Sequence, residues 1–154
     1  MASALIAYLH YVAMMSIAVI LVVEYMICMP GMTGARIRQL ARLDLFYMIA
    51  AILALGSGAA RVVWFGKGAA FYLHNPVFYV KLALFVAVGL ISVPPTLQYL
   101  RWLRGVKAGA ANVAADYQVQ RVRRLVLVEL VLFAFIPLMA TLMARGIGIQ
   151  TVIQ

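Results

Sequence analysis

The sequence predicts an all-α protein, an integral membrane four-helix bundle, from its composition, its four long apolar runs and the placement of its charges. Of its 154 residues, 67% are apolar and only 11% are charged, and the mean hydropathy is +1.04. A soluble domain of this length has too little interior to hide so much apolar surface. We therefore expect lipid to cover that surface, in a single domain over residues 1–154.

The first two predicted spans cover residues 4–28 and 44–65, because a transmembrane helix needs roughly 20 apolar residues. Residues 29–34 separate them and contain the helix breakers Pro and Gly. The first run has neither a basic leader nor a small-residue cleavage site, so we expect it to be retained as a helix.

The third predicted span covers residues 76–100, and the fourth covers residues 122–144. Pro76 would stand in the first turn of its helix, where proline is tolerated. Pro94 and Pro95 fall near the far end of the same helix, where we expect them to cause a kink.

The cations predict the orientation of these helices. They gather in the first and third connections, whereas the second holds only Lys67. The first connection has Arg36, Arg38 and Arg42. The third has Arg101, Arg104, Lys107, Arg121, Arg123 and Arg124. Cytoplasmic loops carry an excess of Lys and Arg. We therefore expect the first and third connections in the cytoplasm and both termini on the periplasmic side of a bacterial inner membrane. The net charge of +9 then favours anionic lipid as the partner and argues against nucleic acid.

Polar residues recur at helical spacing within the spans, and charges in a membrane usually face the bundle interior. The four stripes are His10, Met14, Ile17, Leu21 and Glu24; Asp44, Tyr47, Ala51, Ala54, Gly58 and Arg61; Lys81, Phe85, Val88, Ser92 and Tyr99; and Glu129, Phe133, Ile136, Ala140 and Met143. Each stripe keeps one helix face. We expect the stripes to converge on one interior.

Three carboxyl groups fall in the cytoplasmic half of this interior, on Glu24, Asp44 and Glu129. They lie close enough in sequence to the loop arginines to form ion pairs with them. The alternative is a proton relay, which is a recurring use of acidic residues inside membranes.

Basic groups fall in the outer half, where His10, Arg61 and Lys81 have similar depths and His74 lies just outside. Because no acidic residue is present on this side, the cations would be buried without partners, which is costly. Either Arg61 and Lys81 reach the surface, or an anionic ligand lies between them. Haem suits such a site, since imidazole binds iron, propionates pair with cations and a four-helix core accommodates a flat cofactor. His74 could be a second axial ligand, a lid residue or an ordinary loop histidine.

Two further clusters have both a functional and a structural interpretation. Six rings surround the second connection, where they could form an aromatic belt at the headgroup layer or a lid over a pocket: Trp64, Phe65, Phe71, Tyr72, Phe78 and Tyr79. Four sulfur-bearing residues end the first span, where they could bind Cu(I) or fill apolar space: Met26, Cys28, Met29 and Met32. Cys28 is the single cysteine, which excludes an intrachain disulfide.

Three segments resemble an uncharacterised bacterial family of small four-helix membrane proteins: RVVWFGKGAAFYLHNPVFYVKL at residues 61–82, SVPPTLQYLRW at 92–102, and residues 121–129. More distantly, the layout is similar to the HemJ-type protoporphyrinogen oxidases, which are haem-binding membrane enzymes. That family has a histidine in its first helix and a lysine followed by leucine early in its third, which His10 and Lys81-Leu82 match. The position two residues before this lysine, often histidine in that family, is Tyr79 here. The layout also resembles the CopD-like copper-resistance membrane proteins.

Three functions follow as hypotheses. The first is a membrane-embedded b-type haem protein acting in electron transfer or oxidation, with His10 as the iron ligand, Arg61, Lys81 and His74 as further cofactor-binding residues, and a quinone or another redox partner. It would be a haem-dependent oxidoreductase if it is an enzyme. The second is copper handling, and the third is a non-catalytic subunit or scaffold. Exposed small residues would allow a homodimer in each case.

Overall fold

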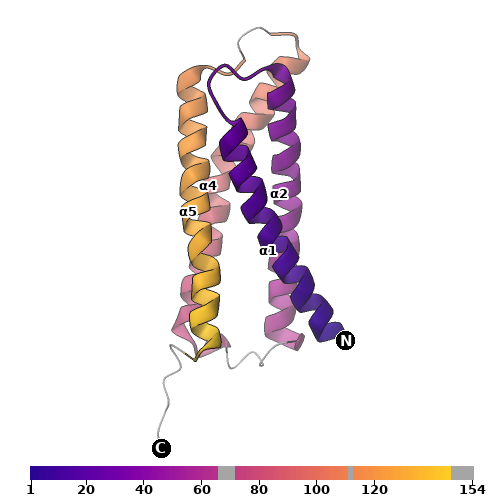
Figure 1. The fold of residues 1–154 in the computed structure, drawn as a ribbon, viewed down its shortest axis with the longest axis vertical. Coiled ribbons are helices and arrows are strands. Elements are labelled where there is room, and N and C mark those ends of the chain that lie inside the picture. Colours follow the sequence, from indigo (N-terminus) through magenta and orange to yellow (C-terminus); the bar gives the residue numbers. More distant parts are fainter. Residues whose placement is uncertain (66–71, 111–112, 147–154) are drawn as a thin grey trace, which may run out of the picture.

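The structure, a computed structural model, describes residues 1–65, 72–110 and 113–146, and these form an all-α bundle (Figure 1). The helices are α1 (Ala2–Ile27), α2 (Gly34–Ala60), α4 (Pro76–Lys107) and α5 (Asp116–Ala144), and α2 continues into a short π-helical segment, η1 (Arg61–Phe65). All four long helices have the length and apolarity needed to cross a membrane. The predicted fold class is therefore confirmed: this is a multi-pass membrane protein with four transmembrane helices.

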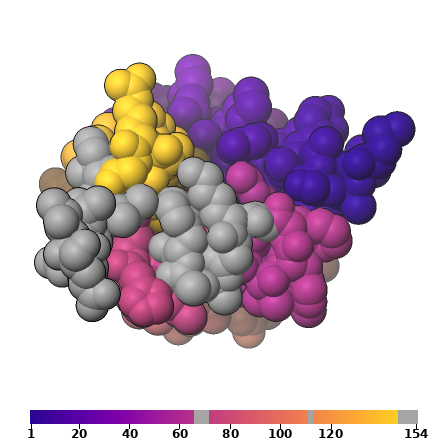
Figure 2. Space-filling view, turned by 90° about the horizontal axis from the view of Figure 1, so that it is seen from below, coloured from indigo at the N-terminus to yellow at the C-terminus, as the bar shows by residue number. Residues whose placement is uncertain are grey.

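The helices run alternately up and down, so the start of α1 and the end of α5 lie at the same end of the bundle (Figure 1). We call this the terminal end. The opposite end carries the connections from α1 to α2 and from α4 to α5, and we call it the arginine-rich end. The arginines predicted for these connections lie in the adjoining ends of α2, α4 and α5, because these helices extend past the apolar residues. The chain packs as two hairpins, α1 with α2 and α4 with α5, which then meet each other. Viewed from the terminal end, the start of α1 protrudes away from the other helices (Figure 2).

Three of the long helices extend beyond the predicted spans at the arginine-rich end. α2 begins at Gly34 rather than near residue 44, α4 continues to Lys107, and α5 begins at Asp116. Hydropathy marks the apolar part of a helix, whereas the helix itself ends where its backbone hydrogen bonds end. Thr33 supplies such a signal for α2, because its hydroxyl accepts the Arg36 backbone N–H at 3.4 Å.

α4 begins as the sequence predicts and then continues through its two internal prolines. Pro76 occupies the first turn, and the Asn75 side chain caps the helix by accepting the Val77 backbone N–H at 2.9 Å. Pro94 and Pro95 lie within the helix, which continues as one element to Lys107. The proline pair therefore does not end the helix.

The core confirms the predicted inward faces of the helices. Buried residues include His10, Ile17, Leu21 and Glu24 of α1; Asp44, Tyr47 and Ala54 of α2; Val88 and Tyr99 of α4; and Glu129, Phe133, Ile136 and Met143 of α5. The largest side chains gather toward the arginine-rich end, where Trp102 is 1% exposed. Its indole N–H donates to Gln118 Oε1 at 3.2 Å and joins α4 to α5. The interior near this end is therefore filled by large side chains.

Candidate functional site: a cavity in the terminal half

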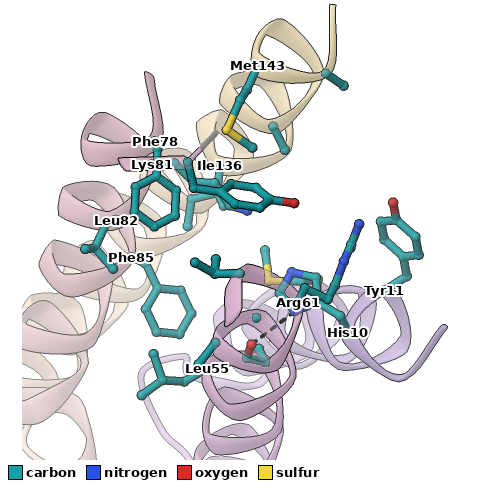
Figure 3. Close-up of a pocket in the computed structure, with 18 of the residues that line it drawn as sticks. His10, Tyr11, Leu55, Arg61, Phe78, Lys81, Leu82, Phe85, Ile136 and Met143 are labelled. Carbon is teal, nitrogen blue, oxygen red and sulfur yellow. Dashed lines mark hydrogen bonds between the residues drawn. The ribbon is translucent and has the colours of Figure 1, made fainter. Parts of the chain in front are cut away.

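A cavity of about 440 Å³ lies in the terminal half of the bundle, between the α1–α2 hairpin and the α4–α5 hairpin (Figure 3). Its volume is in the range of small-molecule sites, roughly 300–1,000 Å³. All four long helices and η1 contribute to its wall, which includes His10, Met14, Ala54, Gly58, Arg61, Phe78, Lys81, Phe85, Ile136 and Met143. The predicted outer-half residues of the four stripes therefore do converge.

His10 is held in one orientation by α2. Its Nδ1 lies 3.0 Å from the Ala54 carbonyl oxygen and 3.1 Å from Ser57 Oγ. Since a carbonyl oxygen can only accept, Nδ1 carries the proton in this pair, and Nε2 is the nitrogen that keeps a lone pair for a ligand. Gly58 makes the approach possible, because a Cβ there would lie 3.2 Å from His10 Cε1.

Arg61 and Lys81 bring two positive charges to the same cavity from opposite hairpins. The Arg61 guanidinium lies over the Tyr11 ring, with its Cζ 5.3 Å from the ring centroid, an attractive cation–π geometry. Lys81 is within electrostatic range of both Arg61 and His10. The four acidic residues of the chain are Glu24, Asp44, Asp116 and Glu129, and none of them lines this cavity. The cations therefore face it without a carboxylate from the lining residues.

Most of the remaining wall is apolar. Leu55 of α2 is 55% exposed and Leu82 of α4 is 42% exposed, and both line the cavity. These leucines lie within helices that span the membrane, so the surface they expose faces lipid. Part of the cavity wall therefore borders the bilayer.

The predicted ring cluster divides into two groups. Tyr72 and Phe78 line the cavity, with their ring centroids 5.8 Å apart. Trp64 is 75% exposed, and Tyr79, at 51%, donates its hydroxyl to the Leu73 carbonyl oxygen at 3.0 Å. Phe65, at 37%, is also exposed, and Phe71 lies outside the described residues, as does Lys67. Two of the six rings therefore form a wall, and the exposed ones stand where an aromatic belt is expected.

His74 is exposed on the turn before α4 and is not among the described residues that line the cavity. Two methionines occupy places that the sequence did not single out as ligands: Met14 of α1 and Met143 of α5. The labelled Met143 side chain extends from α5 toward the cavity (Figure 3). In the sequence, both methionines belong to the inward-facing stripes, and this position was the signal that they would face the interior. Ser57, which fixes His10, was also missed, although a serine beside a glycine within an apolar helix is a signal for a polar contact.

The sulfur-bearing cluster at the end of α1 has mixed surroundings. Met26 is 65% exposed and Met29 is 43% exposed, whereas Cys28 is fully buried. The Cys28 thiol lies 3.8 Å from the Val119 carbonyl oxygen, to which it donates. Met32 packs against the hydrophobic core. The structure therefore does not gather these four side chains in one environment, and the described residues contain no group of three or more His, Cys, Asp or Glu side chains arranged to hold a metal ion.

The carboxyls of Glu24, Asp44 and Glu129 lie in the half of the bundle nearer the arginine-rich end. Asp44 Oδ1 accepts the Thr96 hydroxyl at 2.8 Å. Arg123 of α5 stacks its guanidinium on the Tyr25 ring at 4.4 Å. Asp44 thus has a hydroxyl partner, and Arg123 has an aromatic one.

Comparison with known proteins assigns nearly the whole chain to one family model. Residues 2–148 match the model of a family described as "Predicted membrane protein (DUF2214)". No curated protein matches the chain, and no solved structure does.

Proposed function

Since this chain belongs to the DUF2214 family of predicted membrane proteins, whose description names no activity, we propose a function from the geometry of the cavity. The protein is a membrane-embedded b-type haem protein that acts in electron transfer or oxidation. The observation that carries this proposal is the fixed orientation of His10 at a cavity lined by two cations and apolar side chains.

His10 has the surroundings of a metal-binding imidazole. Metal-bound histidines usually donate their second ring N–H to a carbonyl or carboxylate, which fixes the tautomer and the ring orientation. Ala54 and Ser57 supply this contact at Nδ1, so Nε2 would hold the iron. Met143, which lines the cavity from α5, could serve as a further iron ligand, since His and Met are both known to hold haem iron.

The other residues fit the shape and charge of the same group. Arg61 and Lys81 would pair with the two propionates, since charge-assisted hydrogen bonds to carboxylates are strong, and this would remove the cost of leaving two cations unpaired in a membrane. Phe78 and Phe85 would cover the ring and exclude water. Bound haem would supply one-electron redox chemistry, with its potential set by the axial ligands and the apolar surroundings.

The exposed wall residues Leu55 and Leu82 support a partner that moves within the bilayer, of which a quinone is one class. The distribution of loop arginines supports an orientation with the cavity in the periplasmic half of a bacterial inner membrane. Single cysteines at Ser3 and at Ala110, treated in intact cells with a membrane-impermeant thiol reagent, test this orientation. We expect labelling at position 3 and not at position 110, because position 3 lies at the terminal end. The native Cys28 is fully buried and should add no background. Labelling only at position 110 would reverse the orientation.

A visible absorption spectrum tests the haem proposal directly. The full chain, expressed with a haem supply and purified in detergent, should show a Soret band. The chain has two histidines, which gives a matched pair of variants: His10→Ala should lose or shift the band, and His74→Ala should keep it. Circular dichroism of both variants reports whether the helices remain. A folded wild-type protein that stays colourless after addition of haem would reject the proposal.

The cations give a second, graded test. Arg61→Gln and Lys81→Gln each remove a propionate partner but leave the iron ligand in place. We expect both to keep the Soret band and to bind haem several-fold more weakly, because the affected interaction is with the periphery of the ligand. Arg145→Gln, which changes a cation outside the cavity lining, serves as the control. Equal affinities in all three variants would remove Arg61 and Lys81 from the site.

A further inference from the structure

The interior near the arginine-rich end holds three carboxyl groups from three different helices. Glu24 of α1 is 2% exposed, Asp44 of α2 is 6% exposed and Glu129 of α5 is 1% exposed. Asp44 lies within electrostatic range of both glutamates, and Glu129 lies within range of Glu24. Three of the chain's four carboxylic side chains therefore share one buried region, which we call the carboxyl cluster.

The cluster is only partly satisfied by hydrogen bonds. Oε1 of Glu24 and Oε1 of Glu129 are buried and have no hydrogen-bond partner. Asp44 accepts the Thr96 hydroxyl, and the Glu129 carboxyl group also has a hydrogen-bonding contact with the Tyr47 side chain. Tyr99 is fully buried within electrostatic range of all three carboxyls. Its hydroxyl lies near the Cys28 thiol but makes no hydrogen bond of good geometry. Buried polar atoms are nearly always paired, so the two glutamate oxygens and the Tyr99 hydroxyl, which we call the open positions, need hydrogen-bond partners.

Among the residues that the structure describes, no cation donates a hydrogen bond to Oε1 of Glu24 or of Glu129. The charged and titratable groups that the packed elements bring to this region, besides the three carboxyls, are Cys28, Tyr47, Tyr99 and Arg123. Arg123 interacts with Cys28 and with the Tyr25 ring, and its own buried Nε has no hydrogen-bond partner. Three ionised carboxylates in a membrane interior would repel one another and lose their hydration.

We propose that Glu24, Asp44 and Glu129 form a buried proton-binding site, which exchanges protons with water at the arginine-rich end. A bound proton turns a carboxylate into a donor that can satisfy a neighbouring carboxylate oxygen, so protons would fill the open positions. The arrangement favours a proton over a metal ion, because the described residues contain no group of His, Cys, Asp or Glu with a metal-holding geometry. This site goes beyond the proposed haem function and is independent of it.

Glu24 lies much nearer to the arginine-rich end than to the cavity. It is three residues before the end of α1 at Ile27, which is about 4.5 Å along the helix. His10 lies 14 residues away on the same face, about 21 Å at 1.5 Å per residue. Between them, α1 buries the apolar residues Ala13, Ile17 and Leu21, which are 3%, 1% and 1% exposed. The carboxyl cluster is therefore a site apart from the cavity, and its nearer water is that of the arginine-rich end.

Infrared difference spectroscopy on the full chain in nanodiscs tests this proposal, because a protonated carboxyl has a C=O stretching band apart from the amide bands. We expect the haem-free protein at neutral pH to show such a band, with the isotope shift of an exchangeable proton in D₂O. Glu24→Gln, Asp44→Asn and Glu129→Gln should each reduce or remove it. Asp116→Asn changes the exposed fourth carboxyl and should leave the band unchanged.

Two results would overturn the proposal. In the first, the wild-type protein has no carboxylic band at neutral pH, and the band appears only in acid, over the same pH range as the band of Asp116. The other is loss of the neutral-pH band on addition of Na⁺ or Ca²⁺, which would identify a cation site. Both measurements use the wild-type chain, so they remain decisive if a variant fails to fold. Since haem is absent throughout, their outcome is separate from that of the Soret experiment.

Discussion

Gly58→Ala tests whether the position of the His10 ring matters for ligand binding. An added Cβ at residue 58 would lie 3.2 Å from His10 Cε1 and 3.6 Å from its Nδ1. Carbon atoms pack best at about 3.5–4.0 Å, so the ring must move by roughly 0.3 Å or more. The contacts affected are those of Nδ1 with Ala54 at 3.0 Å and with Ser57 at 3.1 Å, which set the direction of Nε2.

The expected loss follows from the role of such contacts. Disturbing the groups that orient a metal-binding histidine typically costs 10- to 100-fold in affinity, and a tenfold loss equals about 1.4 kcal/mol. We expect haem titrations of Gly58→Ala, followed at the Soret band, to give an affinity reduced by about tenfold. Alanine favours a helix interior over glycine by up to about 1 kcal/mol, so the helix itself should not be weakened.

The same helix offers a matched control. Gly56 stands two residues earlier in α2, and an added Cβ there meets nothing within 4 Å. Gly56→Ala should therefore bind haem as the wild type does, with the same gain in helix preference. If Gly58→Ala and Gly56→Ala bind haem with equal affinity, the reasoning that the position of the His10 ring controls ligand binding is refuted.

Two other pairs of variants test the packing of the arginine-rich half by thermal unfolding in detergent. Thr96→Val removes the hydroxyl that donates to Asp44 at 2.8 Å, and this should cost about 1–3 kcal/mol of stability. Tyr99→Phe removes a hydroxyl without a hydrogen-bond partner, so its effect on stability should be neutral or favourable. Equal losses of stability in the two variants would contradict the hydrogen-bond assignment. Gly105→Ala would place a Cβ 2.5 Å from Val113 Cγ1, so we expect about 1–3 kcal/mol of destabilisation from overpacking. Adding Val113→Ala should restore most of the lost stability. If stability does not recover, the contact with Val113 is not the source of the destabilisation.

The helix faces show how far hydropathy and spacing determine this protein. Four apolar runs fixed the number and order of the spans, because lipid requires long helices whose backbone bonds are satisfied internally. Helical spacing placed His10 and Glu24 on one inward face, and burial of both confirms it. The helix ends at the arginine-rich end were not predictable from hydropathy, because α2 and α5 extend past the apolar residues into charged sequence.

The site required the tertiary structure. The sequence determined that the chain is a four-helix membrane protein and that its basic and acidic residues occupy opposite halves of the interior. It did not determine that Ala54 and Ser57 hold His10, that Met143 reaches the cavity, or that Thr96, rather than an arginine, contacts Asp44. These depend on the rotation of each helix and on which hairpins meet, and both are decided by side-chain packing between segments far apart in the chain. Periodicity along one helix cannot encode such contacts.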